Sequence, residues 1–151
     1  MSVKCFLPDI TQQDIDSIVN TVSSKVLAFG KNVEKFENKY AQFSKKKYNI
    51  GFNSASSAAY LLFQYLYETL GSCNVYTTSI GFVSPVFAAL KNNHHVHFID
   101  VQEDVLLCTD HLLDNIQDNG LPNIIMPVLY GGVSTVPGLV NKLKNLDHIM
   151  V

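Results

Sequence analysis

The first 43 residues place apolar side chains at helical spacing, which predicts two amphipathic helices that are separated by Gly30. The run Thr11-Gln12-Gln13-Asp14 is typical of a capping box and predicts the start of the first helix. The apolar faces are formed by Ile15, Ile18, Val19 and Val22 in the first helix and by Val33, Phe36, Tyr40 and Phe43 in the second. Both helices are therefore expected to be amphipathic.

From Tyr48 onward, short apolar runs alternate with further helical stripes. The runs predict strands at residues 48–52, 75–78, 96–99, 123–129 and 148–151. The stripes predict helices at residues 56–70, 85–91 and 139–146, and a further helix that Thr109 caps and that covers Leu112, Leu113 and Ile116. This alternation predicts an α/β fold with a mostly parallel sheet and flanking helices. The helix at residues 56–70 is apolar nearly all round, so we expect it to be buried on several sides.

Three turns follow predicted strands, at residues 53–57, 79–82 and 130–131, and we expect them to meet at one crevice beyond the strand ends. The first turn, Asn53-Ser54-Ala55-Ser56-Ser57, places three hydroxyls and several unpaired N–H groups at a helix N-terminus. Such an end suits a phosphate group. It contains no lysine, so it is not a nucleotide-binding Gly-rich loop. An ordinary serine-capped helix is the alternative interpretation.

Composition limits the partners that this chain of 151 residues is expected to have. Hydrophobic residues make up 47% of the chain and charged residues 16%, which favours a large buried face or a protein partner. The net charge is −2 and nothing in the composition favours nucleic acid, which usually needs a clustered basic face, so we expect no nucleic-acid partner. Cys5, Cys73 and Cys108 match no metal or disulfide spacing, which favours a reducing, cytoplasmic setting. We expect no signal peptide and no membrane span.

Five segments of the chain form a recognisable series: Leu27-Ala28-Phe29-Gly30-Lys31-Asn32-Val33-Glu34-Lys35-Phe36-Glu37, Asn53-Ser54-Ala55-Ser56-Ser57-Ala58, Ser79-Ile80-Gly81-Phe82-Val83, Phe98-Ile99-Asp100-Val101 and Val128-Leu129-Tyr130-Gly131. In order and with matching spacing, they resemble the DegT/DnrJ/StrS-type sugar aminotransferase family. The family consists of pyridoxal-phosphate (PLP) enzymes with the aspartate aminotransferase (type I) fold. The resemblance implies an N-terminal helical segment at residues 1–47 and an incomplete PLP-binding large domain at residues 48–151.

The resemblance also implies roles for individual residues. The backbone of Ala55 and Ser56, together with the Ser56 hydroxyl, would hold the cofactor phosphate, and Phe82 would stack on the pyridine ring. Plain core packing is the alternative role for Phe82. This sequence has Ala55 where the family has glycine, Gly81 where it has threonine, and Asn93 where it has glycine.

The family's activity is transamination of a keto-sugar nucleotide with an amino-acid donor, in a homodimer, for amino-sugar and cell-surface polysaccharide synthesis. Its Asp partner of the pyridinium nitrogen and its Schiff-base lysine follow the segment that aligns with the end of this chain, so no catalytic residue is assigned here. Lys142 and Lys144 occupy solvent positions on an amphipathic helix and are poor substitutes. We therefore expect an N-terminal part of such an enzyme that is inactive alone.

Three other interpretations remain open at this point. His94, His95 and His97 suggest a metal site, and His95 and His97 would share a strand face, but a further ligand is missing and exposed strand-end histidines are simpler. A noncatalytic α/β binding or assembly module is a second possibility. A hydrolase is a third, although the serines lack a Gly-x-Ser-x-Gly frame and His148 has no Asp at a recognisable interval.

Overall fold

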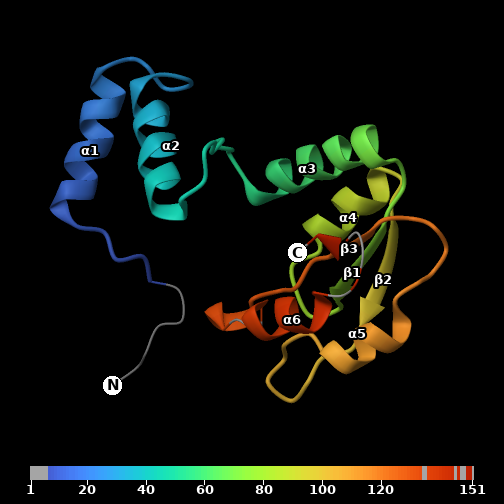
Figure 1. Ribbon diagram of the computed structural model, residues 1–151. Helices are drawn as coiled ribbons and strands as arrows, with labels where there is room; N and C mark the ends of the chain where they lie inside the picture. Colours follow the sequence, from blue (N-terminus) through green and yellow to red (C-terminus); the bar gives the residue numbers. More distant parts are fainter. Residues whose placement is uncertain (1–6, 134–135, 145, 147–148, 151) are drawn as a thin grey trace, which may run out of the picture. The chain divides into compact units, whose positions relative to one another are not determined.

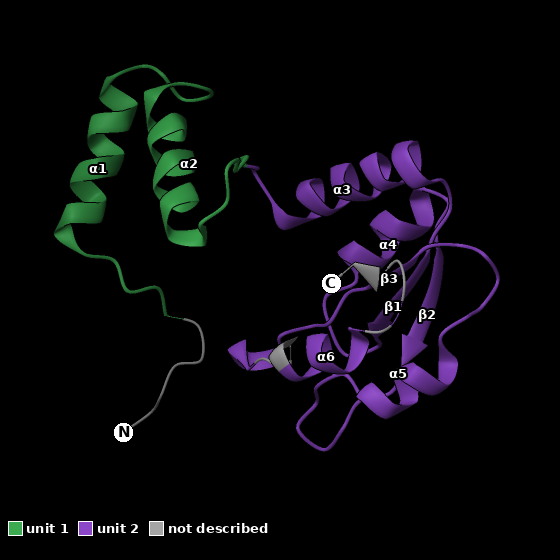
Figure 2. Cartoon of the chain, in the orientation of Figure 1, with its two compact units in different colours: residues 1–51 green, residues 52–151 purple. Residues whose placement is uncertain are grey.

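The computed structural model describes residues 7–133, 136–144, 146 and 149–150. The chain forms two compact units, Met1–Gly51 and Phe52–Val151 (Figure 2).

Unit 1 contains the helices α1 (Gln12–Ser23) and α2 (Lys31–Ser44). The predicted capping box is confirmed, because the Thr11 N–H donates to Asp14 Oδ2 at 2.8 Å and the Asp14 N–H donates to Thr11 Oγ1 at 3.4 Å. Neither helix has a buried residue. Both apolar stripes of unit 1 are therefore left largely uncovered.

The strand predicted at residues 48–52 is wrong. The segment is irregular, Tyr48 is 75% exposed, and no described strand pairs with it. It is fixed instead by a side chain of α2, since the Gly51 N–H donates to Glu37 Oε1 at 2.8 Å. An apolar run without a partner strand cannot satisfy its backbone as a strand would.

Unit 2 is built on a parallel sheet with the strand order β2-β1-β3-β4 (Figure 1). Its strands are β1 (Asn74–Thr78), β2 (His95–Ile99), β3 (Asn123–Ile125) and β4 (Ile149–Met150). Its α-helices are α3 (Ala55–Leu70), α4 (Ser84–Lys91), α5 (Thr109–Asn115) and α6 (Val136–Leu143). Asn74 of β1 is in register with His95 of β2 and with Asn123 of β3. The predicted parallel α/β fold is confirmed.

Several element boundaries differ from the sequence expectation, among them α6, which is expected at residues 139–146 and lies at Val136–Leu143, and the ends of β3 and α5. β3 ends at Ile125 rather than at residue 129, because Pro127 has no N–H to donate to a neighbouring strand. The chain then passes through a 3₁₀ turn, η1 (Tyr130–Gly132). Thr109 is the first residue of α5 and not its cap, a position that Cys108 occupies without a side-chain hydrogen bond.

Helices cover both faces of the sheet, and each face has its own core. The α3 and α4 face buries Phe63, Leu66, Cys73, Val75, Ala88, Ala89 and Ile124. The α5 and α6 face buries Tyr76, Ile99, Leu107, Leu112, Ile125, Leu139 and Leu143. Val75 and Tyr76 are neighbours in β1 and point to opposite cores, as the strand periodicity of two requires.

The expectation that α3 is buried on several sides is wrong for this chain. Its buried residues are Phe63 and Leu66. The other large apolar side chains of α3, which are 41–61% exposed, are Tyr60, Leu61, Leu62, Tyr65, Tyr67 and Leu70. In the described part of unit 2, α4 and the sheet pack against one side of α3, so its remaining circumference has no cover.

Candidate functional site

The N-terminus of α3 combines a capped start with unused donors. Ser54 is the N-cap, and its Oγ accepts a hydrogen bond from the Ser57 N–H at 3.1 Å and lies 3.0 Å from Ser57 Oγ. The Ala58 N–H donates to the Ser54 carbonyl at 3.2 Å. Among the hydrogen bonds of the described residues, none involves the N–H groups of Ala55 and Ser56 or the Ser56 hydroxyl. Ser54 therefore caps the helix, while the free donors belong to Ala55 and Ser56.

The loop between β1 and α4 brings Phe82 to the same place. Phe82 is 78% exposed, so plain core packing, the alternative role for this residue, is wrong. Phe82 and Ser56 together line an open hollow of about 370 Å³. The rest of its wall comes from Tyr60 of α3, from Val83 and from α4, which contributes Ser84, Phe87, Ala88 and Lys91. The sequence-predicted residues Ser56 and Phe82 are thus brought together, and Ala55 precedes Ser56 on the helix end.

A second hollow of about 220 Å³ lies beyond the carboxyl ends of β1, β2 and β3 and shares Phe82 and Val83 with the first. Its wall includes Thr78 of β1, Phe98 of β2 and Val128 after β3. The expected crevice therefore forms from two of the three turns. Tyr130 and Gly131, which form the third turn, line neither hollow.

The loop that carries Phe82 is held closely against the segment after β3. Thr78 Oγ1 donates to the Ile80 carbonyl at 3.0 Å. A Cβ at Gly81 would lie 3.0 Å from Val128 Cγ2, so a larger residue there would force Val128 to move. The glycine at this position therefore fits the close approach of the two segments.

The two other departures from the family pattern are compatible with the backbone. The described non-glycine residues with positive φ are Lys25, Lys45, Asn93 and Val105, and Ala55 is not one of them. Ala55 is the first residue of α3 and needs no left-handed conformation. Asn93 has φ of 60°, a conformation that asparagine tolerates and that explains a glycine at the corresponding family position.

The described residues of this site fit the phosphate and the ring face of PLP but offer no partner for its ring nitrogen. The unpaired N–H groups and hydroxyl at the start of α3 suit a phosphate, and the exposed Phe82 ring offers a flat apolar face to an aromatic ring. No carboxylate belongs to the described lining of either hollow, so nothing there would pair with a pyridinium nitrogen.

Sequence reasoning missed the wall that α3 and α4 form together. Tyr60 follows Ser56 by one helical turn, and Phe87 and Lys91 are one turn apart on α4. The i, i+4 spacing from Ser56 predicts Tyr60 once α3 is assigned. Only the packing of α4 against α3 reveals Phe87 and Lys91.

The metal interpretation of the histidines is not supported. His94 is buried, which corrects the expectation of an exposed histidine: its Nδ1 accepts from the Cys73 N–H at 3.1 Å, and its Nε2 donates to the Phe63 carbonyl at 2.9 Å. His97 Nε2 donates to Asn74 Oδ1 at 3.2 Å. Within residues 7–133, 136–144, 146 and 149–150, no three His, Cys, Asp or Glu side chains form a metal-binding group. His148, which the hydrolase interpretation uses, lies outside the described residues.

The remaining expectations concern lysines, cysteines and membrane spans. Lys142 is exposed and forms an ion pair with Asp110 at 2.9 Å, as expected of a surface lysine. Cys73 and Cys108 are free thiols. Burial raises the pKa of the Cys73 thiol, which makes it unreactive. None of the described helices has the length and apolar character needed to cross a lipid bilayer.

Comparison with known proteins extends the geometric argument. A UDP-4-amino-4,6-dideoxy-N-acetyl-beta-L-altrosamine transaminase of Campylobacter jejuni is 34% identical over 98 residues, which are 64% of this chain and 25% of that protein. The Helicobacter pylori transaminase of the same name is 31% identical over 101 residues, 59% of this chain and 27% of that protein. The chain thus spans about a quarter of the length of these curated relatives.

Solved structures show the same fold. Helicobacter pylori PseC, an aminotransferase involved in the biosynthesis of pseudoaminic acid, matches with a TM-score of 0.80 and 26% identity, over 91% of this chain and 37% of PseC. An E. coli GDP-4-keto-6-deoxy-D-mannose-3-dehydratase with bound hydrated PLP matches with a TM-score of 0.85 and 17% identity, over 95% of this chain and 38% of that chain. The model of the DegT/DnrJ/EryC1/StrS aminotransferase family matches residues 8–149. The chain therefore belongs to the DegT/DnrJ/EryC1/StrS aminotransferase family.

Proposed function

We propose that this chain supplies the cofactor-phosphate part of a PLP-dependent aminotransferase that acts on keto-sugar nucleotides. One observation carries the proposal: Ser56, whose N–H and hydroxyl have no partner among the described residues, and the exposed ring of Phe82 border the same hollow. The names of the Campylobacter and Helicobacter relatives, which are transaminases of a UDP-linked amino sugar, support the substrate class.

Three residues hold the cofactor in this proposal. The N–H groups of Ala55 and Ser56 and the Ser56 hydroxyl donate to the phosphate, at the positive end of the α3 dipole. Phe82 packs on one face of the pyridine ring and fixes its orientation. PLP, when bound, supplies an electron-accepting ring for the amino-transfer chemistry.

A polypeptide of these 151 residues is expected to perform no transamination by itself. Transamination needs a lysine nucleophile with a free amine. Lys142 is exposed, its Nζ lies 2.9 Å from Asp110 Oδ1, and it lines neither hollow, so it is not placed to serve as that nucleophile. In this proposal residues 1–47 are a helical segment and residues 48–151 belong to a PLP-binding large domain, and the structure groups residues 48–51 with unit 1.

The partners proposed are an amino-acid donor, a nucleotide-sugar substrate and a second subunit, in a cytoplasmic enzyme of amino-sugar and cell-surface polysaccharide synthesis. The exposed apolar side of α3 supports an additional protein contact, because such a surface is larger than single scattered apolar residues would make. A homodimer is the assembly proposed for it.

Binding of phosphate-bearing ring compounds tests the proposal without requiring activity. The probe is 4-deoxypyridoxine 5′-phosphate, which has the ring and phosphate of PLP but no aldehyde to react with surface lysines. We expect saturable binding that is at least tenfold tighter than the binding of 4-deoxypyridoxine. That compound lacks the phosphate and therefore cannot form the charge-assisted hydrogen bonds to it. Equilibrium dialysis with ultraviolet detection measures both.

Matched variants separate the site from general effects. Ser56→Ala and Phe82→Ala are each expected to weaken binding several-fold. Their controls are Ser23→Ala at the end of α1 and Phe43→Ala, whose ring is 82% exposed, and neither lines the hollow. Equal binding with and without the phosphate, or equal losses in Ser56→Ala and Ser23→Ala, would refute the proposed phosphate site.

A further inference from the structure

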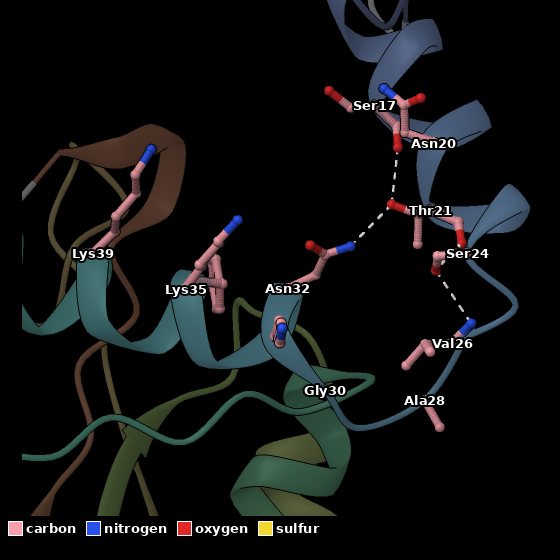
Figure 3. Close-up of a pocket in the computed structure, with 12 residues that line it drawn as sticks. Ser17, Asn20, Thr21, Ser24, Val26, Ala28, Gly30, Asn32, Lys35 and Lys39 are labelled. Atoms are coloured by element: carbon pink, nitrogen blue, oxygen red, sulfur yellow. Dashed lines mark hydrogen bonds between the residues drawn. The ribbon is translucent and has the colours of Figure 1, made fainter.

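A groove of about 940 Å³ lies between α1 and α2, entirely within unit 1 (Figure 3). One wall is a row of three lysines of α2, Lys31, Lys35 and Lys39, and the facing wall is the polar side of α1, which includes Asn20. Lys35 and Lys39 extend from α2 on the side that faces α1 (Figure 3). The volume is within the range of small-molecule sites in proteins, about 300–1,000 Å³.

The lysine row carries charge that the groove does not neutralise. Residues at i, i+4 and i+8 share one helix face, so the three ammonium groups follow α2 over about 12 Å. Like charges at this spacing destabilise a helix. The groove lining contains no carboxylate, and the ion pair found among the described residues, Lys142 with Asp110, belongs to unit 2. An anion in the groove would offset this repulsion.

The start of α2 adds backbone donors to the same groove. Its N-cap is Gly30, which lines the groove and makes no side-chain cap. The first N–H groups of α2 therefore have no intrahelical acceptor, and Lys31 adds a positive charge at the positive end of the helix dipole. A Cβ at residue 30 would lie 2.8 Å from Val26 Cγ1, so glycine lets the chain approach closely here.

The hydroxyls on the facing wall are already occupied. Thr21 Oγ1 donates to the Ser17 carbonyl at 2.8 Å and accepts from Asn32 Nδ2 at 3.1 Å, and Ser24 Oγ donates to the Thr21 carbonyl at 2.7 Å. The bond between Asn32 and Thr21, which Figure 3 draws, joins the start of α2 to the end of α1 without using the lysines. The donors left for a ligand are therefore the ammonium groups, the backbone N–H groups and the Asn20 amide, and the charged donors among them favour an anion.

We propose that the groove between α1 and α2 binds a diphosphate group. One phosphate lies at the N-terminus of α2, where N–H groups and Lys31 converge, and the second is held by Lys35 and Lys39 along the row. Inorganic diphosphate and the diphosphate of a nucleotide share this chemistry, and Phe36, which also lines the groove, gives a nucleotide base an apolar contact. The proposal uses unit 1 alone and does not depend on the PLP site in unit 2.

Calorimetric titration of the full chain with inorganic pyrophosphate tests this site. We expect saturable one-to-one binding that weakens as salt is raised, because exposed charges are screened. The double variant Lys35→Gln/Lys39→Gln is expected to bind at least tenfold more weakly, since each lost lysine removes a charged hydrogen bond. The charge-matched control Lys46→Gln/Lys144→Gln changes two exposed lysines outside the groove and is expected to bind within twofold of the unmodified chain.

A titration with UDP identifies the source of the diphosphate, and controls on folding and on the second site exclude indirect effects of the substitutions. UDP that binds more tightly than pyrophosphate indicates a nucleotide, and equal affinities indicate inorganic diphosphate; both support the site. Absence of saturable binding, or equal losses in the two double variants, overturns it. Circular dichroism confirms that both variants keep their helices, and 4-deoxypyridoxine 5′-phosphate binding is expected to stay unchanged in both, so either proposal can fail without the other.

Discussion

Replacing His94 by alanine should destabilise unit 2 strongly. His95 and His97 lie close to it in the sequence, but His94 is the buried one of the three. The ring is 3% exposed and connects the chain before β1 with α3, because it accepts from the Cys73 N–H and donates to the Phe63 carbonyl. It also packs against the rings of Phe63 and Tyr67, with centroids 5.4 Å and 6.1 Å away.

The magnitude follows from the groups that lose their partners. The buried Cys73 N–H is left without an acceptor, which costs about 1–3 kcal/mol. The Phe63 carbonyl loses less, because carbonyls inside a helix also accept a helical hydrogen bond. Loss of the two aromatic contacts adds about 0.5–1.5 kcal/mol each. We therefore expect the free energy of unfolding to fall by roughly 3 kcal/mol, which lowers the melting temperature of a unit of this size by about 10–25 °C.

Urea denaturation followed by circular dichroism measures the loss, with His95→Ala as the control. His95 is exposed and the structure gives its ring no hydrogen bond, so its replacement is expected to change stability by less than about 0.5 kcal/mol. A His94→Ala loss below about 1 kcal/mol, or equal losses in the two variants, would show that the bonds to Cys73 and Phe63 do not hold α3 to the sheet.

Three other predictions concern unit 2. Burial and the neighbouring His95 charge lower the pKa of His97, so the imidazole binds a proton more tightly in the unfolded state than in the folded state. The free energy of unfolding should therefore fall as pH drops below about 6.5. Urea titrations at acidic and neutral pH should show a smaller fall in His97→Gln. Asn93→Ala should cost about 1 kcal/mol, because φ is 60°, whereas Asn93→Gly should not. Tyr76→Phe should cost about 1–3 kcal/mol, because the hydroxyl donates to Asn123 Oδ1 at 3.1 Å and accepts from the Gln117 N–H at 2.8 Å.

A different measurement would contradict each of these three predictions. An unchanged pH slope in His97→Gln would mean that another group causes the acid sensitivity. Equal stabilities of Asn93→Ala and Asn93→Gly would show that the left-handed backbone is not strained. A Tyr76→Phe variant as stable as the parent would indicate that water replaces the lost hydroxyl.

Sequence patterns predicted the elements whose causes are local. The capping box of Thr11 and Asp14 and the helix with Pro85 in its first turn depend on neighbours a few residues away, and both are present. The alternation of strands and helices likewise predicted a parallel sheet, since parallel pairs need a crossover between them.

The sequence predictions are wrong where the structure of a segment depends on residues far away in the sequence. Residues 48–52 have the apolar character of a strand, but a strand also needs a partner, which no local pattern reveals. The burial of α3 was overestimated because periodicity shows which sides are apolar and not which are covered. In the candidate site, sequence alone did not separate the capping role of Ser54 from the unused donors of Ser56, which depends on hydrogen-bond geometry.

The position of β1 between β2 and β3 has a consequence for biosynthesis. Asn123, which bonds to Asn74 across the sheet, is 49 residues later in the chain. At about 5–20 residues per second, a ribosome needs roughly 2–10 s to make that stretch. For those seconds one edge of β1 is open and α3 has already emerged with its aromatic and leucine side chains exposed. Nascent chains on the same polysome are therefore at risk of pairing with one another before their own third strand arrives.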